Sequence, residues 1–446
     1  MSVFSTTCRA RLIRSLLAAT LLAPAAGSLR ATEPLSLQEA QKLAAARSGQ
    51  LLAQNASSRA AREMAVSAGQ LPDPVLKLGI DNLPASGPDR LSLGRDFMTM
   101  RRIGLMQELP RAEKRQLRAE RFERDAERAL AQGQVALAGL QQGTALAWLE
   151  RYYAQAMRAL LQQQMEETRL QEQGADIAFR EGRGAQADVF AARAAQIELD
   201  DRLSQIDRQA RGANLMLVRW IGTDAQRVLS GAPEWQTLRG HNSVNGPDAM
   251  LSGEELRQHP KLAVSAAVLE AAQTEARLAQ ANTKSDWTVE AAYQQRGPAY
   301  SNMVSIGVSI PLQWDPKNRQ HRDIAAKLAA VDEARANDEE TRRAYEAEVR
   351  SLINDWQNGK ERIARYTGQL IPVAGQRSAA ALTAYRIGKG DLASVLAARR
   401  DEISTRIQTL SLELETARLW AQLNYLKPDN SIAPGATPSA SSKGQP

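Results

Sequence analysis

The sequence predicts a mainly α-helical protein with a small β part, in an extended rather than compact arrangement. Only 4% of the 446 residues are aromatic, whereas globular domains at this length need aromatic-rich cores. Ala, Leu, Gln, Arg and Glu dominate instead, as is typical of long helices packed side by side. The same order of helical and alternating segments also occurs twice along the chain.

The first residues have the pattern of a secretory signal peptide. Arg9, Arg11 and Arg14 precede a short apolar run at 16–23, and small residues follow it. We therefore expect residues 1–31 to be removed on export.

Charge and cysteine content narrow the function classes. The chain has 57 Lys and Arg against 50 Asp and Glu. Residues 1–31 hold four of the basic residues and no acid, so the remainder carries 57 − 4 = 53 basic against 50 acidic residues. This small excess of positive charge gives no support to a nucleic-acid partner.

The only cysteine, Cys8, precedes the apolar run, so we expect no disulfide and no lipid anchor in the mature chain. No later stretch approaches the ~18 apolar residues of a spanning helix, so any membrane-embedded part must consist of strands.

The chain is predicted to be a tandem duplication. Residues 182–193 recur in pattern at 388–399, with Gly-x-Gly at the start and Ala-Ala-Arg at the end of both. The predicted parts are a signal peptide (1–31), a first repeat (32–221), a linker (222–250), a second repeat (251–426) and a disordered tail (427–446).

Each repeat begins with an Ala-rich helical segment, predicted at 35–70 and at 252–284. A change to period two then predicts a pair of strands with a hairpin between them. The four predicted strands cover residues 76–81, 97–108, 287–294 and 303–310. Alternation is clean in the second repeat and blurred in the second strand of the first.

A helix of about 70 residues should follow each strand pair, about 100 Å long at 1.5 Å per residue. A Gly-x-Gly then breaks it and a shorter helix returns, which gives a long antiparallel hairpin. The long helices are predicted at 111–181 and 318–387, and the returning helices at 188–221 and 392–426. Pro372 should bend the second long helix, because proline removes a backbone donor.

Four strands cannot close a barrel alone, and an open edge is not tolerated in lipid. Closed membrane barrels need about eight strands or more. Three copies would supply twelve strands, so we expect a shared 12-stranded transmembrane β-barrel above a trimeric α-barrel of helical hairpins.

Several motifs resemble those of the TolC-like outer-membrane efflux proteins over essentially the whole mature chain, in particular the heavy-metal branch that serves cobalt-zinc-cadmium or copper-silver pumps. Around the strands these are Leu71-Pro72-Asp73-Pro74, Ile103 to Pro110 with Lys114-Arg115, and Ile306 to Leu312 with Asn318-Arg319. At the hairpin turns they are Arg180-x-Gly182 with Asp188-Val189, and Tyr385-Arg386-x-Gly388 with Val395-Leu396.

The resemblance implies a homotrimer in outer-membrane lipid that extends into the periplasm. It implies an exit duct for heavy-metal cations, loaded through a periplasmic adaptor by an inner-membrane proton-driven pump. Asp188 and Tyr385 fall where the family closes its periplasmic entrance. Ser394 stands where the family commonly has Asp, and Gly49 where it has Pro.

The turns are also candidates for a docking and gating surface without the resemblance. Two glycines let the backbone reverse direction, and several basic side chains lie close together in each turn. Ordinary helix C-caps with favourable cations are the alternative interpretation. The candidate residues are Arg180, Gly182, Arg183, Gly184, Asp188, Val189, Tyr385, Arg386, Gly388, Lys389, Gly390 and Val395.

The sequence gives no support to an enzyme, a cofactor or a metal site. The three histidines, His241, His259 and His321, are scattered, and no metalloprotease, phosphate-loop or Gly-x-Ser-x-Gly motif occurs. The methionines near residue 100 are interpreted as packing residues. The alternatives to metal efflux are a channel for drugs or for type I protein secretion and, from another class, a soluble periplasmic coiled-coil adaptor or scaffold.

Overall fold

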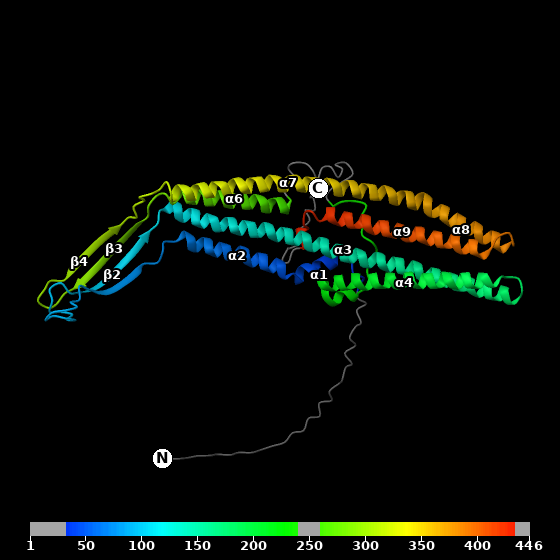
Figure 1. Cartoon of the computed structure of the whole chain (residues 1–446), viewed down its shortest axis with the longest axis horizontal. Helices are drawn as coiled ribbons and strands as arrows, with labels where there is room; N and C mark the ends of the chain where they lie inside the picture. Colours follow the sequence, from blue (N-terminus) through cyan, green and yellow to red (C-terminus); the bar gives the residue numbers. More distant parts are fainter. Residues whose placement is uncertain (1–32, 240–258, 433–446) are drawn as a thin grey trace, which may run out of the picture.

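The computed structural model describes residues 33–239 and 259–432. The molecule is a long rod with a four-stranded sheet at one end and two helical hairpin turns at the other (Figure 1). The predicted signal peptide, part of the linker, the start of the second repeat and most of the tail lie outside the described residues.

The helices and strands follow the predicted order in both repeats. The first repeat contains α1 (Leu37–Arg47), α2 (Gly49–Gly69), β1 (Val75–Asp81), β2 (Met100–Leu109), α3 (Ala112–Arg180) and α4 (Gln186–Ile221). The second contains α6 (Pro260–Ala281), β3 (Trp287–Gln295), β4 (Met303–Ser309), α7 (Gln320–Arg365), α8 (Ile371–Arg386) and α9 (Leu392–Asn424). Three short turns are η1 (Gly222–Gln226), the π-helical η3 (Tyr366–Leu370) and η4 (Asn430–Ile432).

Two helices are less continuous than predicted. The first segment, predicted as one helix over 35–70, is split at Ser48, whose hydroxyl accepts a hydrogen bond from the Leu51 amide at 3.3 Å and caps α2. The second long helix is interrupted by η3, directly before Pro372. Because Pro372 has no N–H for the carbonyl four residues earlier, a wider π turn at this point accommodates the missing bond.

The four strands form one antiparallel sheet in the order β1-β2-β3-β4. The central pair joins the two repeats, with Gly104 opposite Ala292. Within the described residues β1 and β4 each have one neighbour, so the sheet has two open edges.

The two faces of the sheet differ in polarity. One carries apolar side chains in register across all four strands, and these are strongly exposed: Leu78 is 71%, Val304 73% and Ile306 77% accessible. The other carries Lys77, Arg102, Gln294 and Ser305 among small residues. An exposed apolar face of this extent on a sheet needs a covering layer.

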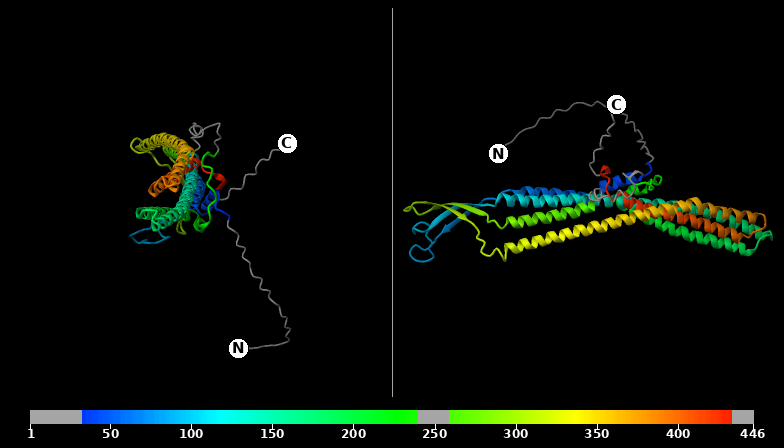
Figure 2. Two further views of the ribbon diagram at one scale, coloured as in Figure 1. Left: turned by 90° about the vertical axis from the view of Figure 1, so that its right-hand side faces the viewer. Right: turned by 90° about the horizontal axis from the view of Figure 1, so that it is seen from above.

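Helices from both repeats lie side by side along the rod. Near the sheet, α2, α3, α6 and α7 are neighbours, and toward the hairpin turns α3, α4, α8 and α9 pack together (Figure 2). Only α3 runs the whole distance without interruption.

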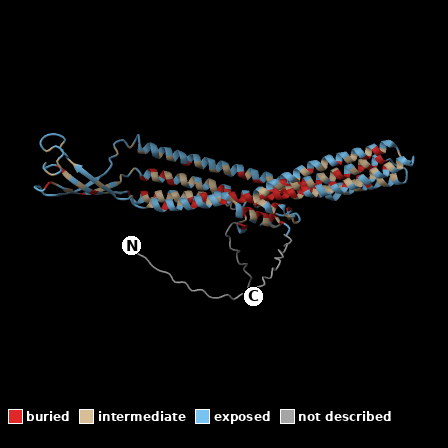
Figure 3. Ribbon diagram, turned by 90° about the horizontal axis from the view of Figure 1, so that it is seen from below, coloured by how far each residue is buried: buried red, intermediate tan, exposed pale blue. Residues whose placement is uncertain are grey.

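Burial is concentrated at the middle of the rod, where α1 and the inter-repeat segment cross the helices (Figure 3). Three indoles tie extended backbone to the helices there: Trp148 donates to the Leu35 carbonyl at 3.2 Å, Trp356 to the Trp235 carbonyl at 3.3 Å, and Trp420 to the Thr237 carbonyl at 2.7 Å. Trp235 and Ile432, from segments assigned to linker and tail by composition, are buried in this core.

Close helix packing near this core makes a specific glycine necessary. A Cβ at Gly359 would lie 2.4 Å from the Thr416 hydroxyl of α9. We expect Gly359→Ala to lower the free energy of unfolding by about 1–3 kcal/mol through overpacking. The measurement is the thermal unfolding midpoint of detergent-solubilised protein, followed by circular dichroism.

Gly139 in α3 is the matched control, because a Cβ there meets nothing within 4 Å. Gly139→Ala should leave stability unchanged or raise it by up to about 1 kcal/mol. Equal midpoints for the two variants would contradict the close α7–α9 contact.

Candidate functional site

The two hairpin turns have the same backbone geometry. Gly182 and Gly388 adopt φ of 70° and 72°, a conformation that L-residues rarely adopt and that ends many helices. In each turn the next amide reaches back across the helix end at 2.9 Å, from Arg183 to the Ala178 carbonyl and from Lys389 to the Ala384 carbonyl.

The second glycine of each turn is required for a different reason. A Cβ at Gly184 would lie 3.1 Å from the Ala178 side chain, and one at Gly390 would lie 3.2 Å from the Ala384 side chain. Both turns therefore use one glycine for the backbone reversal and one for close approach.

A small apolar cluster holds the two hairpins together near the turns. We call Ala175, Val189, Leu392 and Val395 the tip cluster; all four are buried, and Tyr385 packs against them. The structure thus brings together three of the predicted site residues, Val189, Tyr385 and Val395. The Asp188 carboxylate accepts a hydrogen bond from the Ala185 amide at 3.3 Å.

The cations of the two turns differ in their partners. Arg180 pairs with Asp176 at 2.6 Å, and Arg183 pairs with Glu181. Among the described residues, no ion pair is formed by Arg386 or Lys389. The cations of the second turn are therefore not held by ion pairs within the described residues.

The helices that leave the turns are capped by acids at different positions. After the first hairpin turn, the acid is Asp188, which lies in the first helical turn of α4. After the second hairpin turn, Ser394 occupies the position equivalent to Asp188. The acid that caps this helix is Asp391, whose carboxylate accepts a hydrogen bond from the Ser394 amide at 2.6 Å. Hydrogen bonds from the Ser394 side chain and backbone hold the pKa of Asp391 below its ordinary value. The missing acid at 394 is thus replaced three residues earlier.

Removing this cap should have a pH-dependent effect. Because the folded-state pKa of Asp391 is lowered, its contribution is present at neutral pH and is lost as pH falls through that pKa. We expect Asp391→Ala to speed hydrogen–deuterium exchange in peptides from the start of α9 at neutral pH, and the difference from wild type should become smaller at a second, acidic pH. Asp188→Ala, the matched control, should affect only the start of α4. An increase that is the same at both pH values would contradict a carboxylate cap.

A charged network on the polar face of the sheet was not predicted from the sequence. Lys77 Nζ lies 2.7 Å from Glu290, which also pairs with Arg102; Arg102 in turn lies 3.9 Å from Asp81. These residues come from β1, β2 and β3. Their charges at alternate strand positions were a signal, but only the pairing register shows that they meet.

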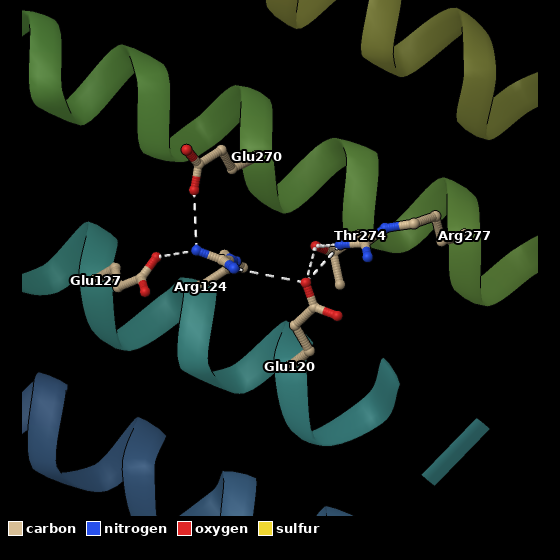
Figure 4. Close-up of polar contacts among 6 residues, drawn as sticks. All are labelled: Glu120, Arg124, Glu127, Glu270, Thr274 and Arg277. Atoms are coloured by element: carbon tan, nitrogen blue, oxygen red, sulfur yellow. Dashed lines mark hydrogen bonds and ion pairs between the residues drawn. The ribbon is translucent and has the colours of Figure 1, made fainter. Parts of the chain in front are cut away.

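Ion pairs also line the boundary between the two repeats (Figure 4). Arg124 of α3 contacts Glu270 of α6 at 3.0 Å, and Glu120 of α3 pairs with Arg277 of α6 at 2.5 Å. Further along, Glu275 lies between Arg121 and Lys327, and the hydrogen bond from Lys327 lowers its pKa. These partly exposed pairs fix the lateral register of α3 against α6, and each contributes little stability alone.

A more buried pair joins the sheet to the helices. Lys114, near the start of α3, is 4% exposed, and its ammonium lies 2.8 Å from Asp286, the residue before β3. Asp286 also accepts the Arg111 amide at 3.1 Å. This carboxylate therefore anchors the start of α3 to the beginning of the third strand.

Lys114→Ala would leave Asp286 without its cation, so we expect a loss of about 3 kcal/mol in the free energy of unfolding. The exposed pair Lys284–Glu113, at 2.6 Å, is the matched control, and Lys284→Ala should cost less than about 1 kcal/mol. Both effects can be read from thermal unfolding in detergent. Comparable losses for the two variants would show that burial of Lys114 is unimportant.

The described residues contain no group of three or more His, Cys, Asp or Glu that could hold a metal ion. His259 is occupied with Tyr345, whose hydroxyl lies 3.1 Å from its Nδ1. In the described part of the chain, no helix combines the length and apolarity needed to cross a membrane.

The comparisons with known proteins agree with this architecture. The sequence profile of the family described as outer membrane efflux protein matches residues 251–426. No curated protein sequence matches the chain.

Several solved structures have the same fold at low sequence identity. The outer-membrane channel OprN has a TM-score of 0.72 at 18% identity, with 87% of this chain and 89% of that chain covered. The CmeC outer membrane channel of Campylobacter jejuni has a TM-score of 0.71 at 13% identity, covering 87% and 85%. CusC has a TM-score of 0.70 at 14% identity, covering 88% and 92%.

The fold is that of TolC-like channels, mainly helical with long helices and four antiparallel strands per chain. The profile match is confined to residues 251–426, so this part of the chain is similar in sequence to outer membrane efflux proteins.

Proposed function

We propose that this chain is the passive exit duct of a tripartite efflux system, and that three copies form its channel. The observation that carries this proposal is the open four-stranded sheet. Its apolar face is exposed and its β1 and β4 edges are free within the described residues, so neither lipid nor water suits the single copy.

Three copies joined edge to edge would give twelve strands, enough for a closed barrel. The apolar face would then lie against lipid and the charged face would line the interior. The helical hairpins of the three copies would continue below the barrel as a hollow cylinder, and export of the chain would follow from the signal peptide proposed at residues 1–31.

The hairpin turns are the proposed docking and gating surface for a periplasmic adaptor. The residues are Arg180, Gly182, Arg183, Gly184, Asp188, Val189, Tyr385, Arg386, Gly388, Lys389, Gly390 and Val395. Support comes from the tip cluster, which fixes the two turns relative to each other. The unpaired Arg386 and Lys389 add a positive surface suited to acidic groups on a partner. An inner-membrane proton-driven pump would supply the energy.

Heavy-metal cations are the proposed cargo. The motif resemblance to the heavy-metal branch supports this, and so does the polar face of the sheet. That face carries three carboxylates, Asp81, Glu108 and Glu290, against two cations, Lys77 and Arg102, which favours cations over anions. Drugs or a secreted polypeptide are the alternative cargoes, and a soluble periplasmic scaffold is the alternative class.

The channel proposal is tested on the purified full-length mature protein. We expect a trimer by light scattering in detergent and stepwise ion conductance in a planar lipid bilayer. A soluble monomer obtained without detergent would overturn the proposal and favour the scaffold.

The cargo is tested separately in the host. Deletion of the chain, or of the pump encoded beside it, should lower tolerance to zinc, cobalt, cadmium or copper and leave drug tolerance unchanged. Lower tolerance to drugs alone would assign the duct to drug export.

A further inference from the structure

We propose that Glu290 sets the charge selectivity of the barrel interior by neutralising Lys77 and Arg102. This inference rests on the proposed channel function. Glu290 is the residue on which the network converges, since its carboxylate contacts both cations, whereas Asp81 reaches Arg102 only at 3.9 Å.

The network lies on the face that lines the interior. Cross-strand partners share a face of an antiparallel sheet, and the rows that contain Leu78, Val304 and Ile306 form the exposed apolar face. Lys77, Arg102 and Glu290 occupy the alternate rows. In a closed barrel the apolar rows face lipid, so the network faces the water-filled interior.

Small residues let the charged side chains lie flat on the wall. Gly104 is opposite Ala292 and separates the row of Arg102 from that of Glu290, and a Cβ at Gly104 would lie 3.0 Å from the Ala292 side chain. The Arg102 Nε is buried and has no hydrogen-bond partner. The guanidinium is therefore packed down against the sheet toward Glu290 and away from the centre of the channel.

Removing one carboxylate per chain would be enough to abolish the net charge of the interior. The inward strand positions hold three acids and two bases, a net −1 per chain and −3 for three copies. Loss of Glu290 would bring the sum to zero and leave Lys77 and Arg102 facing the channel with Asp81 as their remaining acid. Loss of Lys77 would instead bring the net charge to −2 per chain, or −6 for three copies.

The test compares oppositely charged changes in the purified trimer. In a planar bilayer under a potassium chloride gradient, Glu290→Gln should lower the potassium-to-chloride permeability ratio, and Lys77→Gln should raise it. One charge about 8 Å from the permeating ion in water changes the local concentration of that ion about twofold and that of the opposite ion inversely, so the ratio should change by at least about twofold. It should be largest near 0.01 M salt and vanish near 1 M, where screening is strong.

Two further variants separate selectivity from folding. The double variant Lys77→Gln with Glu290→Gln removes one charge of each sign and should return to the wild-type ratio. Arg101→Gln removes a cation from the lipid-facing row and should leave the ratio unchanged. Trimer formation by each variant is checked by light scattering.

The outcomes are distinguishable. Conducting trimers whose permeability ratio is the same in wild type, Glu290→Gln and Lys77→Gln would overturn this inference and leave the channel function intact. An equal shift from Arg101→Gln would also overturn it, since the effect would not depend on the face. A wild-type protein without conductance would overturn the channel function and the inference together.

Discussion

The architecture depends on backbone groups that one chain cannot satisfy. The outer strands β1 and β4 each leave a row of N–H and C=O groups unpaired within the described residues, and the sheet between them has one apolar and one charged face. Such a sheet is stable only if its edges meet other edges and its two faces meet different media. The proposed assembly of identical chains would meet both conditions at once, and the long helices would then continue the wall of the proposed barrel.

Duplication explains how two similar units build this wall, and the differences show where each unit has its own chemistry. The turns at Gly182 and Gly388 have the same φ values and the same returning hydrogen bond. Their charges are arranged differently, since the cations of the first turn have acids beside them. The acid that begins the returning helix has also moved, from 188 in the first repeat to 391 in the second. The backbone of the repeat is therefore more constant than its electrostatics.

Much of the fold could be predicted because its signals are local. Period two identified the strands, and the Gly-x-Gly sequences placed the turns within a few residues. The split at Ser48 was missed because the apolar pattern continues across it, and only the side-chain cap reveals the break. The network around Glu290 could not be predicted either, since Lys77 and Glu290 are 213 residues apart in sequence and meet only through the strand register. For the same reason, local sequence did not show that Trp235 and Ile432 belong to the core.

The π turn at 366–370 has a consequence for side chains far from it. Buried positions in α7 repeat every seven residues at Val349, Trp356 and Ile363, a spacing that would continue to 370, where Leu370 in the π turn is exposed, and then to 377. The buried residue of α8 is instead Ser378, one position later. One additional residue rotates everything beyond it by about 100° around the helix axis. The direction in which Tyr385 points is thus determined about four helical turns away, at the interruption over residues 366–370.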